Sequence, residues 1–344
     1  MFPPPKVTVV IPNWNTACWL PGCLNGLREQ TFRDFQIVLV DNGSEDESVE
    51  LVTQGYPEVK LIRFPTNLGF AKAANAGLEW AQSEYIALLN VDTIPQPAWL
   101  ATLVEVMDRS PAEIGSVTSK MLSLDNPTLI DDAGNLFSWY GSAQKRGQGQ
   151  PATAFNHLEE VLSGSGGATL YRRSFFEAVG KFDEDFVSYL EDVDLGLRGQ
   201  LLGYRCLFVP GAEIWHKWSG GAIPRPTYVT YSTRNRAALL LKNVPGKLLL
   251  KHWRTILYGQ LYFFLVYKHP FASLRGYVAL VYTLVTILKT RFTLQQQKKI
   301  STATLEHTIS DQLSEPALTE IVRLKFNSRA VEANPSPVEN KLFE

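Results

Sequence analysis

Apolar runs alternate with amphipathic stretches along the first 110 residues of the chain. Short runs of apolar or β-branched residues, each bounded by turn residues, predict buried strands at 7–11, 36–40, 60–64 and 85–90. Between these runs the apolar positions follow a helical spacing, which predicts helices at 17–30, 48–54, 71–82 and 98–109. The pattern therefore predicts an α/β fold with a Rossmann-like, mixed but mostly parallel sheet flanked by helices.

The pattern becomes irregular between residues 122 and 162. This stretch is rich in Gly, Asp, Asn and Gln and predicts a partly antiparallel excursion. Ordered elements then return as a strand at 167–171, a helix at 173–179, a helix from the acidic cluster at 191–194 to about 202, and a strand at 204–209.

Two apolar runs of 13 residues, 255–267 and 276–288, dominate the later part of the chain. As helices, each would be about 20 Å long, which is short of the roughly 30 Å hydrocarbon core of a bilayer. Two alternatives follow: core helices of a small C-terminal domain, or a monotopic pair that lies in the plane of a membrane surface. Residues from 295 onward are polar and predict a partly helical or loosely ordered tail, with one helix near 317–325.

Charge is distributed unevenly, although the 344 residues sum to a formal charge of −1. Residues 242–299 contain seven Lys, three Arg and no Asp or Glu, so this segment carries +10 and the remainder −11. Because Lys and Arg near an anionic lipid surface contribute about 1 kcal/mol each, this asymmetry favours the membrane alternative. The overall composition, with 45% hydrophobic and 19% charged residues, excludes a disordered chain and a protein that coats nucleic acid.

Three cysteines, Cys18, Cys23 and Cys206, form no Cys-x-x-Cys pair. Their odd number and spacing argue against structural zinc and favour a reducing compartment. The first residues lack the apolar stretch of a signal peptide, so we expect the catalytic part in the cytoplasm.

Polar side chains follow the first two predicted strands. Pro12 ends the first strand, and Asn13 and Asn15 offer donors and acceptors to a flat heterocycle, although a plain turn explains them equally well. Asp41 ends the second strand before an Asn-Gly turn and can accept an N–H from a pyrimidine ring.

Acids mark two further positions. Asp92 follows a buried strand, where a carboxylate must be paired, cap the next helix or hold a cation such as Mg²⁺ or Mn²⁺. Glu191, Asp192 and Asp194 stand where a helix begins. The helix dipole explains part of this cluster, but three acids exceed what a cap needs, and one is a candidate general base.

Taken together and in this order, these motifs resemble the inverting family 2 glycosyltransferases of the GT-A fold. The likeness is greatest to the bacterial rhamnosyltransferase-like branch that builds surface polysaccharides. It covers about residues 5–240 and rests on the segments 7–15, 40–44, 67–70 with Asn75, 89–93 and 191–194.

The resemblance implies a role for individual residues. The nucleotide sugar would be held by Pro12, Asn13, Asn15, Asp41, Asn67, Gly69, Asn75, Asn90 and Asp92. Asp92 and His216 would bind a divalent cation, Mg²⁺ or Mn²⁺, at the donor diphosphate. Asp192 would be the catalytic base, with Glu191 in reserve, and Gly166, Gly167 and Asp194 would lie on the acceptor side. Many family members carry Asp where this chain has Asn90, so we expect a modest metal affinity.

The implied activity is the transfer of a sugar, with inversion, from a nucleotide diphosphate sugar to a saccharide or a polyprenyl-diphosphate-linked acceptor. Rhamnose from thymidine diphosphate rhamnose is the first expectation, ahead of UDP-hexoses. The expected organisation is a glycosyltransferase domain at 1–240, a basic apolar helical region at 241–294 that binds the inner face of the cell membrane, and a tail at 295–344.

Two alternatives belong to other classes. A sugar-nucleotide pyrophosphorylase needs a Gly-x-Gly-Thr-Arg start, which residues 7–15 lack. A module that only binds sugar nucleotide would not need both Asp92 and Asp192. Arg146 and Arg234 could approach a phosphate or the acceptor, or lie in solvent.

Overall fold

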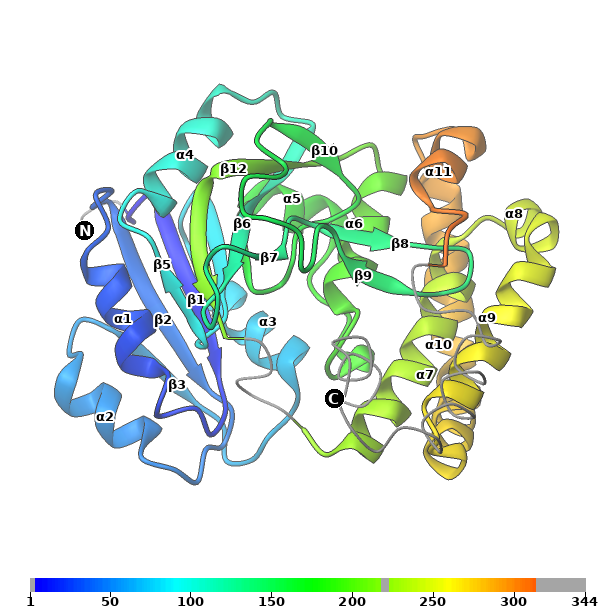
Figure 1. Cartoon of the computed structure of the whole chain (residues 1–344), viewed down its shortest axis with the longest axis horizontal. Helices are drawn as coiled ribbons and strands as arrows, with labels where there is room; N and C mark the ends of the chain where they lie inside the picture. Colours follow the sequence, from blue (N-terminus) through cyan, green and yellow to red (C-terminus); the bar gives the residue numbers. More distant parts are fainter. Residues whose placement is uncertain (1–3, 218–222, 314–344) are drawn as a thin grey trace, which may run out of the picture. The chain divides into compact units, whose positions relative to one another are not determined.

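The computed structural model of the protein describes residues 4–217 and 223–313. Residues 1–310 form one compact unit, and residues 311–344 form a second, of which only 311–313 are described. The first unit is built on a ten-stranded sheet with the strand order β10-β12-β6-β11-β4-β1-β2-β3, in which β5 and β7 pair with β12 and β6 (Figure 1).

The N-terminal part of the sheet is parallel. Its strands are β1 (Val7–Asn13), β2 (Phe35–Asp41), β3 (Lys60–Arg63) and β4 (Tyr85–Leu89). The helices of this part are α1 (Leu20–Arg28), α2 (Ser48–Gly55), α3 (Phe70–Trp80) and α4 (Trp99–Arg109). These eight elements are the ones that the hydrophobic pattern predicts, with small shifts at their ends.

The strand order creates a switch point between β1 and β4. From β1 the chain continues to β2 and β3 on one side, and it then returns to β4 on the other side of β1. In open α/β sheets, ligands bind at such a point, beyond the carboxyl ends of the strands. The register of β1 and β2 places Asn13 directly beside Asp41 at this edge.

The remaining strands make the sheet mixed. β11 (Ala168–Arg172) runs antiparallel to β4 and β6 (Ile114–Ser123), whereas β12 (Arg205–His216) runs parallel to β6. Hydrophobic patterning did not predict β6, because several of its buried residues are polar: Ser116, Thr118, Ser119 and Lys120. The short strands are β5 (Thr93–Pro95), β7 (Ile130–Asp132), β8 (Asn135–Phe137), β9 (Ala143–Lys145) and β10 (Glu159–Val161).

Two of these strands bear on the sequence predictions. The antiparallel hairpin of β8 and β9 confirms the partly antiparallel excursion predicted between residues 122 and 162. β12 continues seven residues beyond the strand predicted at 204–209 and thereby brings His216 to the edge of the sheet, where it pairs with Thr93 of β5.

Both faces of the sheet are covered. Alternate residues of β1 divide between the faces, as the two-residue period of a strand requires: Val9 belongs to a buried cluster that includes residues of α1, α2 and α4, and Val10 belongs to one that includes residues of α3 and of later helices. On the second face lie α5 (Arg173–Val179), the short 3₁₀ helix η1 (Glu184–Phe186), α6 (Glu191–Leu201) and α7 (Arg225–Asn243).

The C-terminal helices are α8 (Gly246–Lys251), α9 (Trp253–Val266), α10 (Pro270–Gln297) and α11 (Thr302–Thr308). α7, α9 and α10 lie side by side (Figure 1). α10 has 28 residues and is about 42 Å long, so the prediction of a 20 Å helix at 276–288 is corrected. The apolar run is only the middle of this helix, because Arg275 and Lys289 border the run while the helix continues beyond each of them.

Two expectations concern the organisation of this region. The expected boundary at residue 240 falls inside α7, and the helix expected at 317–325 lies outside the described residues. By length and composition alone, α10 is the helix within the described ranges that could cross a membrane.

Candidate active site

Asn13 and Asp41 form the first part of the candidate site. Both side chains are buried, and Asn13 Nδ2 donates to Asp41 Oδ1 (3.1 Å) and to Ser44 Oγ (3.1 Å). The backbone N–H of Ser44 donates to Asp41 Oδ2 at 3.3 Å. Asn13 therefore fixes the orientation of the Asp41 carboxylate at the end of β2.

Asn42 organises the neighbouring loop and was not among the predicted site residues. Its Nδ2 donates to Asn67 Oδ1 (2.9 Å) and to the Gly69 carbonyl (3.1 Å), and its Oδ1 accepts from the Leu68 N–H (2.9 Å). The sequence signal was present in the Asp-Asn-Gly run after β2, but it was interpreted only as a turn.

The other residues expected to bind the nucleotide differ in their exposure and in their hydrogen-bond partners. Pro12 is half-buried at the end of β1, and Asn15 is exposed, with its Oδ1 accepting from the Glu45 N–H at 2.8 Å. Asn75 is buried on α3, where it donates to the Phe182 carbonyl (2.9 Å) and accepts from the Phe182 N–H (3.0 Å). Its amide is thus occupied within the protein, which corrects the expectation that Asn75 faces the nucleotide.

Asp92 and His216 face each other at the switch point. His216 Nε2 lies 3.4 Å from Asp92 Oδ1, and Nδ1 lies 2.6 Å from Asp131 Oδ2, which also accepts from Lys145 Nζ (2.7 Å). Burial opposes charge on the imidazole, but the hydrogen bonds to Asp131 and Asp92 outweigh it and raise the pKa of His216 to about 9. Asp131, which sequence analysis missed, orients the ring.

The residue types of this pair suit a divalent cation, which would have to displace the proton that the raised pKa keeps on His216 at neutral pH. Oxygen and imidazole nitrogen are both ligands of Mn²⁺, and Mg²⁺ is commonly held by one or two carboxylates plus substrate phosphates. The hydrogen bond of Nδ1 to Asp131 is the outer-shell arrangement that orients a ligating histidine. Within residues 4–217 and 223–313, no group of three or more His, Cys, Asp or Glu side chains is arranged to hold a metal, so the remaining ligands would have to come from substrate or water.

Asp192 lies at the start of α6 and is half-buried. Its Oδ2 accepts from the Gly166 N–H (2.9 Å) and from Asn135 Nδ2 (3.1 Å), and its Oδ1 accepts from the Val193 N–H (2.8 Å). Burial nevertheless raises the pKa of this carboxyl above its ordinary value, against the effect of these hydrogen bonds. Asn135, on β8, is a second site residue that sequence analysis missed.

Glu191 is unlike its neighbour. Its side chain is buried, and Oε2 has no hydrogen-bond partner among the residues that the structure describes. Burial, followed by the charges of Asp192 and Asp194, raises the pKa of Glu191 to about 8. At neutral pH Glu191 therefore holds its proton, whereas a general base must be able to accept one.

Asp194 is turned into the protein, which corrects its expected place on the acceptor side. Its carboxylate is 0% exposed and lies 2.8 Å from both Lys242 Nζ and Arg198 Nε, and Asn243 Nδ2 donates to it at 2.9 Å. These partners hold the pKa of Asp194 below its ordinary value despite burial. Lys242, only 2% exposed, is likewise removed from the group of cations expected to face lipid.

Gly166 and Gly167 connect Asp192 to the end of β4. Gly166 donates to Asp192, while the Gly167 carbonyl accepts from the Asn90 N–H at 2.9 Å. A Cβ atom at Gly167 would lie 3.2 Å from Asn90 Nδ2. Asp92 and Asp192, a hundred residues apart, are therefore connected through two backbone segments in direct contact.

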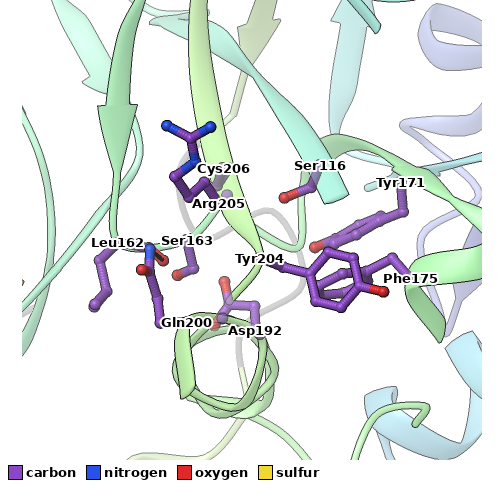
Figure 2. Close-up of a pocket in the computed structure, with 13 residues that line it drawn as sticks. Ser116, Leu162, Ser163, Tyr171, Phe175, Asp192, Gln200, Tyr204, Arg205 and Cys206 are labelled. Atoms are coloured by element: carbon purple, nitrogen blue, oxygen red, sulfur yellow. Dashed lines mark hydrogen bonds between the residues drawn. The ribbon is translucent and has the colours of Figure 1, made fainter. Parts of the chain in front are cut away.

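A small pocket lies beside Asp192, between α6 and β12. Figure 2 shows Asp192 and Gln200 of α6 on one side of it and Arg205 and Cys206 of β12 on the other. Its volume is about 10 Å³, which is the size of a single water molecule. A sugar cannot occupy it, so a donor or acceptor would have to approach Asp192 from the other side of the carboxylate.

Both arginines considered in the sequence have structural partners. Arg146 stacks on Phe155 and Phe208 and pairs with Glu159 (3.1 Å). Arg234 is buried on α7 and donates to the Asp185 carbonyl and to Asn235 Oδ1. Both side chains are therefore held by contacts within the protein.

Solved structures share the fold at low identity. TarS of S. aureus, residues 1–349 in complex with UDP-GlcNAc, has a TM-score of 0.52 and 17% identity and is matched over 94% of this chain and 87% of that one. GalNAc-T7 with UDP, GalNAc and Mn²⁺ has a TM-score of 0.54 and 18% identity, with 77% of this chain and 58% of that one matched. These likenesses establish the GT-A fold expected from the sequence.

Sequence comparison adds the family. The chain is 30% identical over 235 residues to N-acetylglucosaminyl-diphospho-decaprenol L-rhamnosyltransferase of Mycobacterium tuberculosis, covering 60% of this chain and 75% of that protein. It is 28% identical over 239 residues to the O-antigen biosynthesis protein RfbC of Myxococcus xanthus, covering 65% of this chain and 18% of that protein. The family model named glycosyl transferase family 2 matches residues 8–180. This match covers half of the chain and agrees with the α/β sheet and the polar residues at the switch point, so this chain belongs to glycosyl transferase family 2.

Proposed function

We propose that the protein transfers a sugar, with inversion, from a nucleotide diphosphate sugar to a saccharide or a lipid-linked saccharide, and that Asp192 is the base. One observation carries this proposal. The Asp192 carboxylate, with its raised pKa, is joined through Gly166 and Gly167 to the strand end that carries Asn90 and Asp92. A base and a candidate diphosphate site therefore occupy one end of the sheet.

The chemistry is a single displacement. An Asp192 oxygen takes the proton of the acceptor hydroxyl while the hydroxyl oxygen forms a bond to the anomeric carbon of the donor. The bond between that carbon and the diphosphate oxygen breaks, and its electron pair leaves with the diphosphate. Attack from the face opposite the leaving group inverts the anomeric centre. The hydrogen bonds from Gly166 and Asn135 hold the carboxylate in place for this step.

The leaving diphosphate would be stabilised at Asp92 and His216. Charge that develops on it would be neutralised by a divalent cation held between these two side chains. Asp131 keeps Nδ1 of His216 engaged, so Nε2 is the nitrogen that faces Asp92 and that would bind the cation. The nucleoside would lie against Asn13 and Asp41. Asn42 and Gly69 would shape the donor loop, which is the segment 67–71.

The preferred donor is thymidine diphosphate rhamnose, and the preferred acceptor carries a polyprenyl diphosphate. Support comes from the relative in Mycobacterium tuberculosis, whose name states both a rhamnosyl transfer and a decaprenol diphosphate acceptor. A thermal-shift panel of nucleoside diphosphates, with and without Mn²⁺, tests the base and the cation together, because a ligand raises the apparent stability in proportion to ln(1 + [L]/Kd). Equal shifts for all bases would contradict a thymidine or uridine donor.

Asp192→Asn tests the base. The amide keeps the shape of the carboxylate but cannot take a proton, so transfer should fall at least about 10²-fold while nucleotide binding stays within a few-fold. In the unmodified enzyme, kcat/KM should decline at acidic pH around a midpoint above 3.8, the ordinary value for Asp. Unchanged turnover in the variant would remove Asp192 from the mechanism, and nucleotide binding without transfer in the unmodified protein would favour a binding module.

We also propose that α9 and α10 dock the protein in the plane of an anionic membrane surface, at the cytoplasmic face. Exposed apolar residues repeat every four positions along α9: Trp253, Leu257, Leu261 and Leu265. Along α10 they repeat every three or four positions: Phe271, Leu274, Val278, Val281, Tyr282, Val285, Leu288 and Phe292. Exposed apolar surface of this extent is unusual for a protein surrounded only by water.

Charge identifies the surface that would cover these helices. Residues 242–299 contain no acid, and their exposed cations are Lys247, Lys251, Arg254, Lys268, Arg275, Lys289 and Lys299, of which Lys251 pairs with Glu306 (2.7 Å). α10 remains packed on α7 near both of its ends, because Gly276 contacts Thr230 and Arg291 Nη1 donates to the carbonyls of Leu241 and Val244 (2.6 Å each). This packing favours an in-plane helix over one that crosses the bilayer.

Vesicle sedimentation tests the docking. Tyr282→Asp combined with Val285→Asp places two negative charges in the stripe of α10, so binding to vesicles rich in phosphatidylglycerol should be lost. Gln54→Asp, on exposed α2, is the matched control and should bind like the unmodified protein. Binding should also weaken as salt is raised. Retention of the double variant on the vesicles would refute the docking surface.

A further inference from the structure

The chain adopts an unusual backbone just before the base. Val187, Tyr189 and Leu190 have φ values of 62°, 71° and 70°, although none is glycine. Val187, with ψ of −68°, is the centre of a γ-turn that the Ser188 N–H closes onto the Phe186 carbonyl at 2.7 Å. This form of γ-turn is rare and strained, most of all for a β-branched residue, and such strain persists only where the surroundings hold it.

Asn235 holds this segment from α7. Its Nδ2 lies within hydrogen-bond distance of three carbonyls of the segment, those of Phe186 (2.9 Å), Ser188 (3.0 Å) and Tyr189 (2.8 Å), so one of its two hydrogens is shared between two of them. Its Oδ1 accepts from the Arg234 guanidinium at 2.9 Å, which fixes the direction in which the amide points. The side chain is 0% exposed, so no water competes for these bonds.

The donor loop holds the opposite side of the turn. The Ala71 N–H donates to the Val187 carbonyl (3.1 Å), and the Phe70 N–H donates to Ser188 Oγ (3.2 Å). Gly69 makes this approach possible, because a Cβ atom there would lie 2.7 Å from the Val187 carbonyl oxygen. The strained turn is thus clamped between the loop expected at the nucleotide and α7.

From this arrangement we propose that Asn235 is a positioning residue for the base. It fixes the segment that leads into α6 and thereby sets the point at which the helix begins. That point determines whether the Asp192 carboxylate meets Gly166 and Asn135. The inference rests on the proposed role of Asp192, and it extends the active site to a helix that contributes no group to the reacting atoms.

Asn235→Ala removes all three donations to the segment. The turn should relax toward negative φ, and the start of α6 should shift with it. A displacement of about 1 Å at a reacting group can cost about 10²-fold in rate, so we expect kcat to fall by about that factor. The dissociation constant for the nucleoside diphosphate should change by a smaller factor than kcat, because Asn13 and Asp41 lie on β1 and β2, away from the turn, and only the loop at Gly69 contacts it.

The control is Thr233→Val on the same helix. Thr233 is buried, and its hydroxyl has no hydrogen-bond partner in the described part of the chain, so valine keeps the volume and breaks no bond. Hydrogen exchange provides a readout that does not depend on activity. In Asn235→Ala, amides between residues 183 and 195 should exchange faster than in the control, while those of β1 and β2 should be unchanged.

Glycine provides a second variant if Asn235→Ala alone does not fold. Glycine adopts a positive φ without a steric penalty, so Val187→Gly added to Asn235→Ala should restore folding. Transfer should remain slow, because the turn is then held from one side only, by Phe70 and Ala71. A folded double variant with the turnover of the unmodified enzyme would overturn the proposal.

The two readouts separate this inference from the proposed function. Slow transfer with faster exchange at 183–195 and intact nucleotide binding supports the positioning role. Normal kcat in Asn235→Ala overturns it, as does exchange at 183–195 that matches the control. If the unmodified protein transfers no sugar but Asn235→Ala loosens 183–195, the proposed function fails while the clamp itself stands.

Discussion

Replacement of Glu191 by glutamine should stabilise the protein, and the gain should grow with pH. Glu191 is buried beside two other acids, and its pKa is raised from 4.5 to about 8. Between these values the folded protein keeps a proton that the unfolded chain has released, so stability falls as pH rises through this window. Glutamine is neutral at every pH, so Glu191→Gln removes this loss.

The magnitude follows from the size of the window. Each unit of pKa difference corresponds to about 1.4 kcal/mol. The retained proton lowers the free energy of unfolding by about 1 kcal/mol at pH 5.5 and by about 3 kcal/mol at pH 7. Above pH 8 this loss reaches its limit of about 5 kcal/mol. Glu191→Gln should recover most of these amounts, because the amide has nearly the same shape as the protonated carboxyl.

Urea denaturation at pH 5.5, 7 and 8.5, followed by tryptophan fluorescence, measures the difference in the free energy of unfolding between the variant and the unmodified protein. Glu184→Gln is a suitable control, because Glu184 lies near the same segment with its side chain 46% exposed. A gain that does not vary with pH would refute the reasoning, since it would mean that Glu191 titrates alike in the folded and unfolded states.

Two further predictions concern buried partners. Lys242→Met should lower the free energy of unfolding by about 3–5 kcal/mol, because it leaves the Asp194 carboxylate buried with only one of its two cations. Lys247→Met, an exposed change on α8, should cost far less in the same denaturation experiment, and equal losses would argue against the buried pair. Asp131→Asn should weaken Mn²⁺ binding about 10- to 100-fold, because a neutral amide orients His216 less firmly than a carboxylate. Calorimetric titration with Mn²⁺ measures this, and an unchanged affinity would show that His216 needs no such partner or is not a ligand.

Much of the fold follows from local pattern. The alternation of apolar runs and helical spacing predicted the first four strands and four helices, since burial on both faces leaves a parallel strand almost wholly apolar. The pattern failed at β6, where Ser116, Thr118 and Lys120 are buried through partners supplied by distant segments. It also underestimated α10, because the cations Arg275 and Lys289 end the apolar run but not the helix.

The sequence by itself determined which polar residues meet at one edge of the sheet, because the carboxyl ends of parallel strands lie together whatever surrounds them. Asn13, Asp41 and Asp92 were found in this way. Only the tertiary structure decided which side chains remain free for chemistry. Asp192 and Asp194 are two positions apart, yet one faces Gly166 while the other is neutralised by Lys242, which is 48 residues further along the chain. Arg198, four residues after Asp194, can be recognised from the helical spacing, but Lys242 cannot, so the fold completes the ion pair that separates Asp194 from the candidate base.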